Sequence, residues 1–184
     1  DSPIDITQQS KTPDFAKNKS GWSGSGASTG NNTAEVYYGT CNFYQLLENL
    51  PDGFYRVSLN GFYRYGDDEW EQHDDYGWHQ DNVNNVWAMY TIPYSIIMRN
   101  TGREQLYAKF YANNDEVGLP SIFDYAHDSY THSGDKETEL GFIPHTQQGA
   151  HEAFDAGEYP VSLVVPVTNG WLQLGVRKSF GYKN

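Results

Sequence analysis

The chain has 184 residues, and its 24 acidic residues against 12 basic ones give a formal net charge of −12. This length suits one domain with a sizeable hydrophobic core, and the acidity disfavours nucleic acid or an anionic membrane surface as a partner, because both are bound through clustered Lys and Arg. Aromatic residues make up 16% of the chain, and Cys41 is the single cysteine, which excludes an internal disulfide.

Residues 1–33 are polar and rich in Gly, Ser, Asn and Thr, which predicts an opening segment of loops. Phe15 and Trp22 are the large side chains expected to anchor this segment to the core. Short strands are predicted at residues 34–38 and 42–48, where aromatic and apolar residues gather.

The clearest pattern is a strand at residues 54–64, which follows a Pro-Asp-Gly turn. Its side chains alternate between two faces, as in a half-buried strand of an antiparallel sheet. One face carries Tyr55, Val57, Leu59, Gly61 and Tyr63, and the other carries Arg56, Ser58, Asn60, Phe62 and Arg64. The second face combines amide, hydroxyl, guanidinium and aromatic groups, a mixture that suits a polar, ring-shaped ligand such as a sugar.

Residues 66–104 break the strand pattern with a run of acidic and aromatic residues. Sugar rings pack their C–H bonds on aromatic faces, while carboxylates and amides bind the sugar hydroxyls. Trp70 and Trp78, interleaved with acids such as Asp74, supply both kinds of group. A segment of this length in a compact domain is typically functional or disordered.

The later elements follow from local signals. Strands are predicted at residues 106–112, 161–167 and 172–176 from their alternating apolar residues. Asn169-Gly170 is a strong hairpin signal between the last two strands. Two short helices are expected, one at 121–127 capped by Ser121 and one at 147–156 stopped by Gly157.

Several of these pieces resemble the galactose-binding-like β-sandwich modules of proteins that bacteria secrete to capture and break down glycans. The matching pieces are Thr12-Pro13-Asp14-Phe15, Ser20-Gly21-Trp22, the strand from Leu50 to Arg64, Leu106-Tyr107-Ala108, Leu119-Pro120-Ser121-Ile122, Ile143-Pro144, Ala153-Phe154-Asp155-Ala156-Gly157 and Leu174-Gly175-Val176-Arg177-Lys178.

The resemblance implies an all-β fold: one antiparallel jelly-roll β-sandwich over residues 1–184, with one or two short helices and a long insertion at about 66–104. Such modules usually continue with one more strand, built around an Asp-Asn-Phe motif, which is missing after Asn184. We expect either an unpaired sheet edge there or another segment, such as the insertion, in that place.

The predicted ligand site combines stacking rings with polar groups. Its residues are Trp70, Tyr76, Trp78, Arg64, Asn60 and Asp74. For Trp70 and Trp78, exposure at a binding site and burial against the core both stay open, whereas Trp87 is expected to cover the core. The strand arginines Arg56, Arg64 and Arg177 can equally form salt bridges between strands.

No cofactor or metal is predicted. The resemblance implies a structural calcium near the opening segment, but the family places a glutamate directly after the phenylalanine, and here that position is Ala16. The spacing of His73 and His79 matches no zinc signature. His127, His132, His145 and His151 are scattered along the sequence and are expected to be structural or exposed.

The sequence favours a non-catalytic carbohydrate-binding module of a secreted or surface bacterial protein, located outside the cell, at its surface or in the periplasm. The partner would be a glycan or polysaccharide, with neighbouring domains of a parent protein as further contacts. The chain begins at Asp1 without a signal peptide, which is compatible with a signal removed upstream.

Two alternatives stay open. The first is a protein-interaction or structural accessory domain of a larger surface protein that binds no sugar. The second is a hydrolase, which would need two carboxylates held at catalytic separation, a pairing that no sequence motif indicates.

Overall fold

A computed structural model of the chain describes residues 3–36, 40–63, 108–138 and 140–178. Within them the fold is all-β, with antiparallel strand pairing and one α-helix. The strands are β1 (Ala16–Lys19), β2 (Ser23–Ser25), β3 (Ser28–Gly30), β4 (Thr33–Glu35), β5 (Cys41–Glu48), β6 (Gly53–Asn60), β7 (Lys109–Ala112), β8 (Asp115–Gly118), β9 (Lys136–Thr138), β10 (Gly141–Ile143), β11 (Pro160–Val167) and β12 (Trp171–Lys178). The helices are η1 (Thr7–Gln9) and η3 (Ile122–Tyr125), both 3₁₀, and α4 (Gln147–Asp155).

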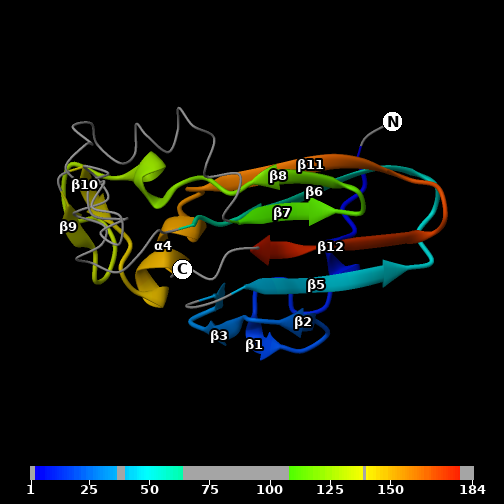
Figure 1. Ribbon diagram of the computed structural model, residues 1–184, viewed down its shortest axis with the longest axis horizontal. Coiled ribbons are helices and arrows are strands. Elements are labelled where there is room, and N and C mark those ends of the chain that lie inside the picture. Colours follow the sequence, from blue (N-terminus) through cyan, green and yellow to red (C-terminus); the bar gives the residue numbers. More distant parts are fainter. Residues whose placement is uncertain (1–2, 37–39, 64–107, 139, 179–184) are drawn as a thin grey trace, which may run out of the picture.

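Two sheets form a sandwich-like arrangement. One has five strands in the order β2-β5-β12-β7-β8, and the other pairs β11 with β6 over eight residues of each strand. The small pairs β3-β4 and β9-β10 complete the described sheets. Figure 1 shows β5, β12, β7 and β6 running along the long axis, with β9, β10 and α4 gathered at one end.

The alternation predicted for the strand at 54–64 is confirmed over β6, whereas the strand ends at Asn60 and the next residues do not continue the alternation. Tyr55, Val57 and Leu59 are half-buried, whereas Arg56, Ser58 and Asn60 are exposed. The inner face packs into the core between the sheets, where the largest fully buried side chains are Tyr159, Phe110, Ile122, Ile143, Leu172, Val165 and Val167. This one-sided burial fixes the register of the strand.

The predicted hairpin at Asn169-Gly170 is wrong. Gly170 has a φ of 79°, so a turn forms there, but β11 and β12 do not pair with each other. The turn instead carries the chain from the two-stranded sheet into the five-stranded one. The Pro-Asp-Gly turn before β6 makes the same kind of crossing, because β5 pairs with β12 and β6 with β11.

The two helix predictions are confirmed in position. The first is shorter than expected: Ser121 caps the 3₁₀ helix η3, accepting from the Phe123 N–H while the Asp124 carboxylate accepts from the Ser121 N–H. The second, α4, ends just before Gly157, whose φ of 82° permits the left-handed cap.

The opening segment, predicted as a polar segment with loops, also contains the short strands β1 to β3. β2 pairs with β5 at the sheet edge. Gly24 makes this possible, because its φ is 90° and a Cβ there would overlap the Asn42 carbonyl. The sequence pattern missed these strands because backbone proximity, and not apolar alternation, positions them.

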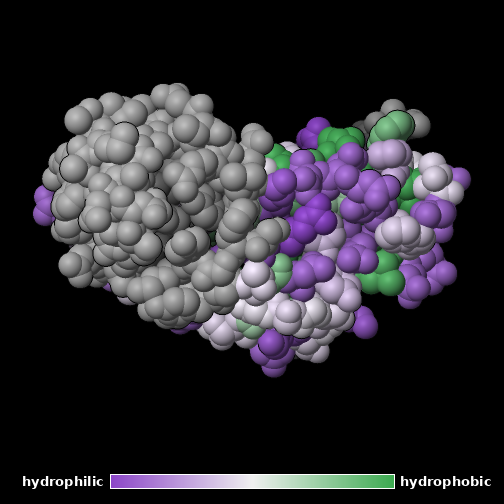
Figure 2. Space-filling view, viewed as in Figure 1, coloured by the Kyte–Doolittle hydropathy of each residue, from purple (hydrophilic) through white to green (hydrophobic). Residues whose placement is uncertain are grey.

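The described surface on the face shown in Figure 2 is mainly hydrophilic, with hydrophobic residues scattered singly. Within the described ranges, no helix combines the length and the apolar character that crossing a membrane requires. The predicted insertion at 66–104 lies outside the described residues.

Candidate functional site

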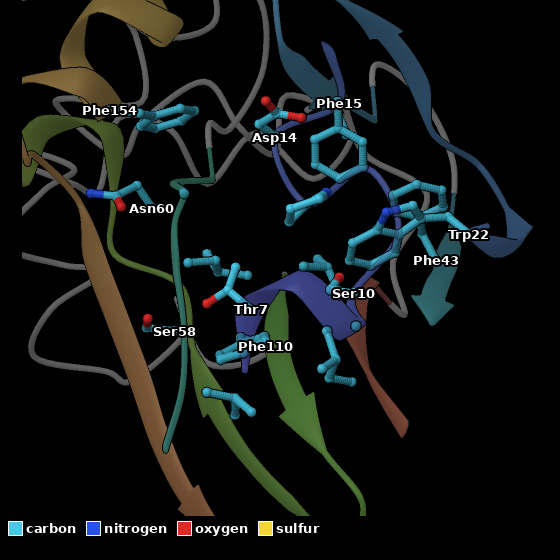
Figure 3. A pocket seen from close by; sticks show the side chains of 18 of the residues that line it. Thr7, Ser10, Asp14, Phe15, Trp22, Phe43, Ser58, Asn60, Phe110 and Phe154 are labelled. Carbon is cyan, nitrogen blue, oxygen red and sulfur yellow. The ribbon is translucent and has the colours of Figure 1, made fainter. Parts of the chain in front are cut away.

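A cleft of about 1940 Å³ opens between the two sheets, on the side where the opening segment passes. Residues from the opening segment, from β6 and from α4 line it, and Phe110 of β7 lies at its base. Figure 3 shows Phe154 and Asn60 on one side of the open space and Asp14 and Phe15 on the other. The cleft therefore combines aromatic rings with amide and carboxylate groups.

The predicted anchoring of the opening segment by Phe15 and Trp22 is confirmed. The Trp22 ring stacks on Phe43 of β5 at a centroid distance of 4.9 Å, and Phe15 packs on Trp22 at 5.1 Å. The indole N–H of Trp22 donates to the carbonyls of Lys11 and Thr12, 3.0 and 3.2 Å away. The polar edge of this tryptophan therefore holds the chain in place, and its ring borders the cleft (Figure 3).

A second attachment of the opening segment was not predicted. The buried amide of Gln45, in the middle of β5, accepts from the Lys11 N–H at 2.7 Å and donates to the Lys11 carbonyl at 2.9 Å. A glutamine at an inward-facing strand position is the signal that could have indicated such a buried partner.

Asn60 is the predicted site residue that falls within the described part of the chain. It ends β6, its side chain is exposed, and its amide donates to the main-chain carbonyl of Glu158 at 2.7 Å. Asn60 is among the residues that line the cleft, and it belongs to the exposed face of β6. The other predicted site residues, Arg64, Trp70, Asp74, Tyr76 and Trp78, lie outside the described residues.

The opening segment gives Asp14 a structural role. Its carboxylate accepts the Ala16 N–H at 3.1 Å, which holds the turn into β1. The weakly signalled calcium site near Asp14 therefore gains no further ligand from Ala16, whose side chain is a methyl group.

Arg177 takes the inter-strand role left open above. It forms an ion pair with Glu116 and lies over the Tyr111 ring at 4.9 Å. Hydrogen bonds from Lys109 and from Arg177 hold the pKa of the Glu116 carboxyl below its usual range. This network lies on the outer face of the five-stranded sheet, away from the cleft.

Phe62 and Phe154 belong to one aromatic group. Phe62, assigned above to the outward face, is half-buried and packs on Phe154 at 5.6 Å and on Tyr159 at 4.8 Å. Tyr159 is fully buried and donates its hydroxyl to the Ile122 carbonyl. Burial, with a smaller contribution from the nearby Glu158 charge, raises the pKa of Tyr159 well above its usual range.

His127 and His132, which sequence reasoning treated as scattered single histidines, lie side by side in the structure. Their rings lie 5.1 Å apart, and Glu158 joins them, so that one ligand atom from each of the three residues lies within 4.8 Å of the others. Within the described residues this is the one group of His, Cys, Asp and Glu side chains close enough to share a metal ion. Sequence spacing carries no signal for it, because His127 and His132 lie in the segment between η3 and β9 whereas Glu158 lies much later, between α4 and β11.

Comparisons of the chain with protein-family models, with curated proteins and with solved structures found no match.

Proposed function

We propose that this chain is a non-catalytic carbohydrate-binding module of a secreted or surface-attached bacterial protein, built as a jelly-roll β-sandwich. The observation that carries the proposal is the cleft between the sheets, whose lining includes the rings of Phe15, Trp22 and Phe154 together with the polar residues Asp14 and Asn60 (Figure 3). Rings pack on the C–H faces of a sugar, and the amide and carboxylate bind its hydroxyls.

The size of the cleft suits a chain of sugars. Sites for single small ligands usually measure roughly 300–1000 Å³, and this cleft exceeds that range at about 1940 Å³. Because solvent-exposed polar residues such as Asp14 form part of its lining, affinity for one sugar unit should be modest. Attachment to a neighbouring enzyme or to a cell surface would then raise the effective concentration of the module on its glycan.

The aromatic insertion offers a second surface for the same ligand. Trp70, Tyr76 and Trp78 would stack on sugar rings, and Arg64 and Asp74 would bind hydroxyls. Asn60 belongs to both surfaces, because it ends the strand that leads toward the insertion and also lines the cleft.

Tryptophan fluorescence, titrated with plant, host and microbial polysaccharides, tests the proposal. Trp22 borders the cleft, and Trp70 and Trp78 lie in the insertion, so a bound glycan should give a saturable shift. Repeating the titration after chelation tests the calcium site near Asp14. A broad panel without any saturable response would refute carbohydrate binding.

Two double variants locate the site. If the cleft binds glycan, Asp14→Ala with Asn60→Ala should weaken binding at least about tenfold, because two hydroxyl-binding groups are lost. If the insertion binds it, Trp70→Ala with Trp78→Ala should abolish binding. Asn114→Ala with Asp115→Ala, in the turn between β7 and β8, is the matched polar control, and Trp171→Ala is the matched aromatic control.

A protein-interaction role is the second candidate, and the outer face of the two-stranded sheet favours it. Phe54 and Val164 are 82% and 55% exposed there, and the register places them on diagonally adjacent positions of β6 and β11. A partner protein captured by the wild type and lost with Phe54→Ser, together with no response to any glycan, would establish this role in place of the first.

A further inference from the structure

Three side-chain ligand atoms converge at the end of the molecule where β9, β10 and α4 lie (Figure 1). His127 Nε2 lies 2.7 Å from Glu158 Oε1, and His132 Nε2 lies 3.6 Å from the same oxygen. Tetrahedral zinc, bound at about 2.0–2.2 Å, separates its ligands by about 3.3 Å. One pair is already near that spacing, and a small rotation of the half-exposed His127 ring would widen the other.

Most of the polar groups in this cluster are buried, and burial of polar groups without hydrogen bonds destabilises a folded protein. The His132 side chain is 5% exposed, Glu158 is 12% exposed and Asp135 is fully buried. Within the described residues, His132 Nδ1, Asp135 Oδ1 and Glu158 Oε2 are buried and form no hydrogen bond. Buried polar atoms are normally paired, because an unpaired one has lost its hydrogen bonds to water without replacement. One imidazole and two carboxylates in this state, with the His127 ring beside them, point to a cation as their common partner.

Asp135 lies where a residue that orients a metal-binding histidine would lie. Its Oδ1 faces His132 Nδ1 at 3.6 Å, on the side of the ring opposite Glu158. Its Oδ2 accepts the N–H groups of Thr131 and His132 at 2.9 and 2.7 Å, so the carboxylate is fixed by the loop that it closes. A carboxylate in this position keeps the proton on Nδ1 and leaves Nε2 free to bind a metal.

The backbone holds Glu158 in place before any ligand binds. At the end of α4, the Gly157 N–H donates to the Phe154 carbonyl and the Glu158 N–H donates to the Ala153 carbonyl, which together form a Schellman cap. The Glu158 carbonyl accepts the Asn60 amide. The next residue, Tyr159, has a φ of 56°, a strained value for a residue with a side chain.

Hydrogen bonds also restrain the backbone that carries His127 and His132. His127 exchanges two main-chain hydrogen bonds with Phe142 of β10, at 2.9 and 2.8 Å. The loop that carries His132 is tied to α4 through Glu152, which accepts from both the N–H and the hydroxyl of Ser133 at 2.7 Å. All three candidate ligands therefore sit on restrained backbone, as a preformed site requires.

We propose that His127, His132 and Glu158 bind a divalent transition metal ion of the zinc class, with Asp135 orienting His132. Imidazole nitrogen and carboxylate oxygen are ligands that zinc takes. The His127 side chain is 30% exposed, so the site opens to solvent there and leaves the fourth position to water. The site is separate from the carbohydrate cleft and does not depend on the proposed function.

Zn²⁺ and Co²⁺ alone are the probes. The full chain, treated with chelator and then titrated near neutral pH, should bind one Zn²⁺ by calorimetry, unfold at a higher temperature with the metal, and give the visible absorption of tetrahedral Co²⁺. Weak binding of several ions to the acidic surface, without this Co²⁺ spectrum, would overturn the proposal.

Variants assign the ligands. His127→Ala and Glu158→Gln should each lower Zn²⁺ affinity by more than the roughly 10–100-fold that loss of an orienting residue costs. His151→Ala is the matched control, because His151 pairs with Asp155 at 3.3 Å on α4, and among the described residues no third ligand joins this pair. If His73→Ala with His79→Ala removes binding and His127→Ala does not, the ion binds elsewhere and the proposal fails.

Asp135→Asn tests the orienting role separately from folding. The amide oxygen can still accept the loop N–H groups, but its NH₂ would face His132 Nδ1 and move the ring proton to Nε2. We expect a 10–100-fold loss of Zn²⁺ affinity with an unchanged melting temperature of the metal-free chain. Unchanged affinity would remove Asp135 from the site.

Discussion

The side-chain amide of Asn60 donates a 2.7 Å hydrogen bond to the main-chain carbonyl of Glu158, and so joins the end of β6 to the turn between α4 and β11. The adjacent main chain continues this link, because the Gly61 N–H donates to the Tyr159 carbonyl at 3.0 Å. Asn60 is among the residues that line the cleft, and Glu158 contributes its carboxylate to the histidine cluster. The two proposed sites therefore share one short piece of backbone.

Replacing Asn60 by Ala should lower the free energy of unfolding by about 1 kcal/mol, the usual net worth of one hydrogen bond. Urea denaturation measures this change. Ser58→Ala is the control, because Ser58 is exposed on the same face of β6, two residues earlier. An equal loss of unfolding free energy in both variants would show that the hydrogen bond from Asn60 to the Glu158 carbonyl does not stabilise the fold.

Tyr159→Phe should destabilise the protein by about 1–3 kcal/mol, because it leaves the buried Ile122 carbonyl without the hydroxyl that now donates to it at 2.7 Å. Chemical denaturation and the melting temperature report the loss.

Tyr55→Phe is the matched control for Tyr159→Phe. The Tyr55 hydroxyl also donates to a carbonyl at 2.7 Å, that of Pro51, but at an exposed position where water can replace it. Its loss should change the free energy of unfolding by about 0.5 kcal/mol or less. If both variants lose the same free energy of unfolding, the burial of the Tyr159 hydroxyl does not explain its contribution to stability.

Acid should loosen the attachment of the His132 loop to α4. Hydrogen bonds from Gln148 and from Ser133 lower the pKa of the Glu152 carboxyl from 4.5 to about 2. Because this pKa is depressed in the folded state, the stabilisation is fully present above pH 4.5 and is lost as the pH falls from 4.5 toward 2.

Glu152→Gln should therefore be less stable than the wild type near neutral pH, and the difference should shrink as the pH falls through that range. Urea denaturation across a pH series measures it. Glu48→Gln, exposed at the end of β5, is the control. A difference that stays constant with pH would contradict the proposed role of the Glu152 charge.

Gly149→Ala should destabilise the protein, although alanine is favoured over glycine in a helix by about 1 kcal/mol. Gly149 is buried in α4, and a Cβ there would lie 2.6 Å from the Ser133 carbonyl oxygen, so the loop that carries His132 would have to move. The melting temperature checks this, and a rise, which helix propensity alone would give, would contradict it.

Local patterns predicted the elements whose cause is local. The alternation along β6 succeeded because one face of the strand is buried, and Ser121 and Gly157 marked helix ends because their side-chain or backbone chemistry suits those positions. The anchoring by Phe15 and Trp22 followed from their size within a polar segment.

Features that depend on distant pairing could not be predicted from local signals. Asn169-Gly170 correctly indicated a turn, but the choice of strand partners rests on packing across the sandwich. The histidine cluster was not predicted for the same reason: Glu158 comes close to His127 and His132 only because the cap of α4 places it there. Of the predicted ligand residues, Asn60 alone falls within the described ranges, so the role of the aromatic insertion stays a prediction.

The two turns that cross between the sheets also govern how the chain can fold during synthesis. β5 pairs with β12, and Cys41 meets Val176 across 135 positions of sequence. Until β11 and β12 leave the ribosome, β6 has none of its described strand partners and β5 has only the short β2. Such non-local pairing is slow to form, so the nascent chain exposes long apolar strands late into translation, when chaperones and proteases compete for it.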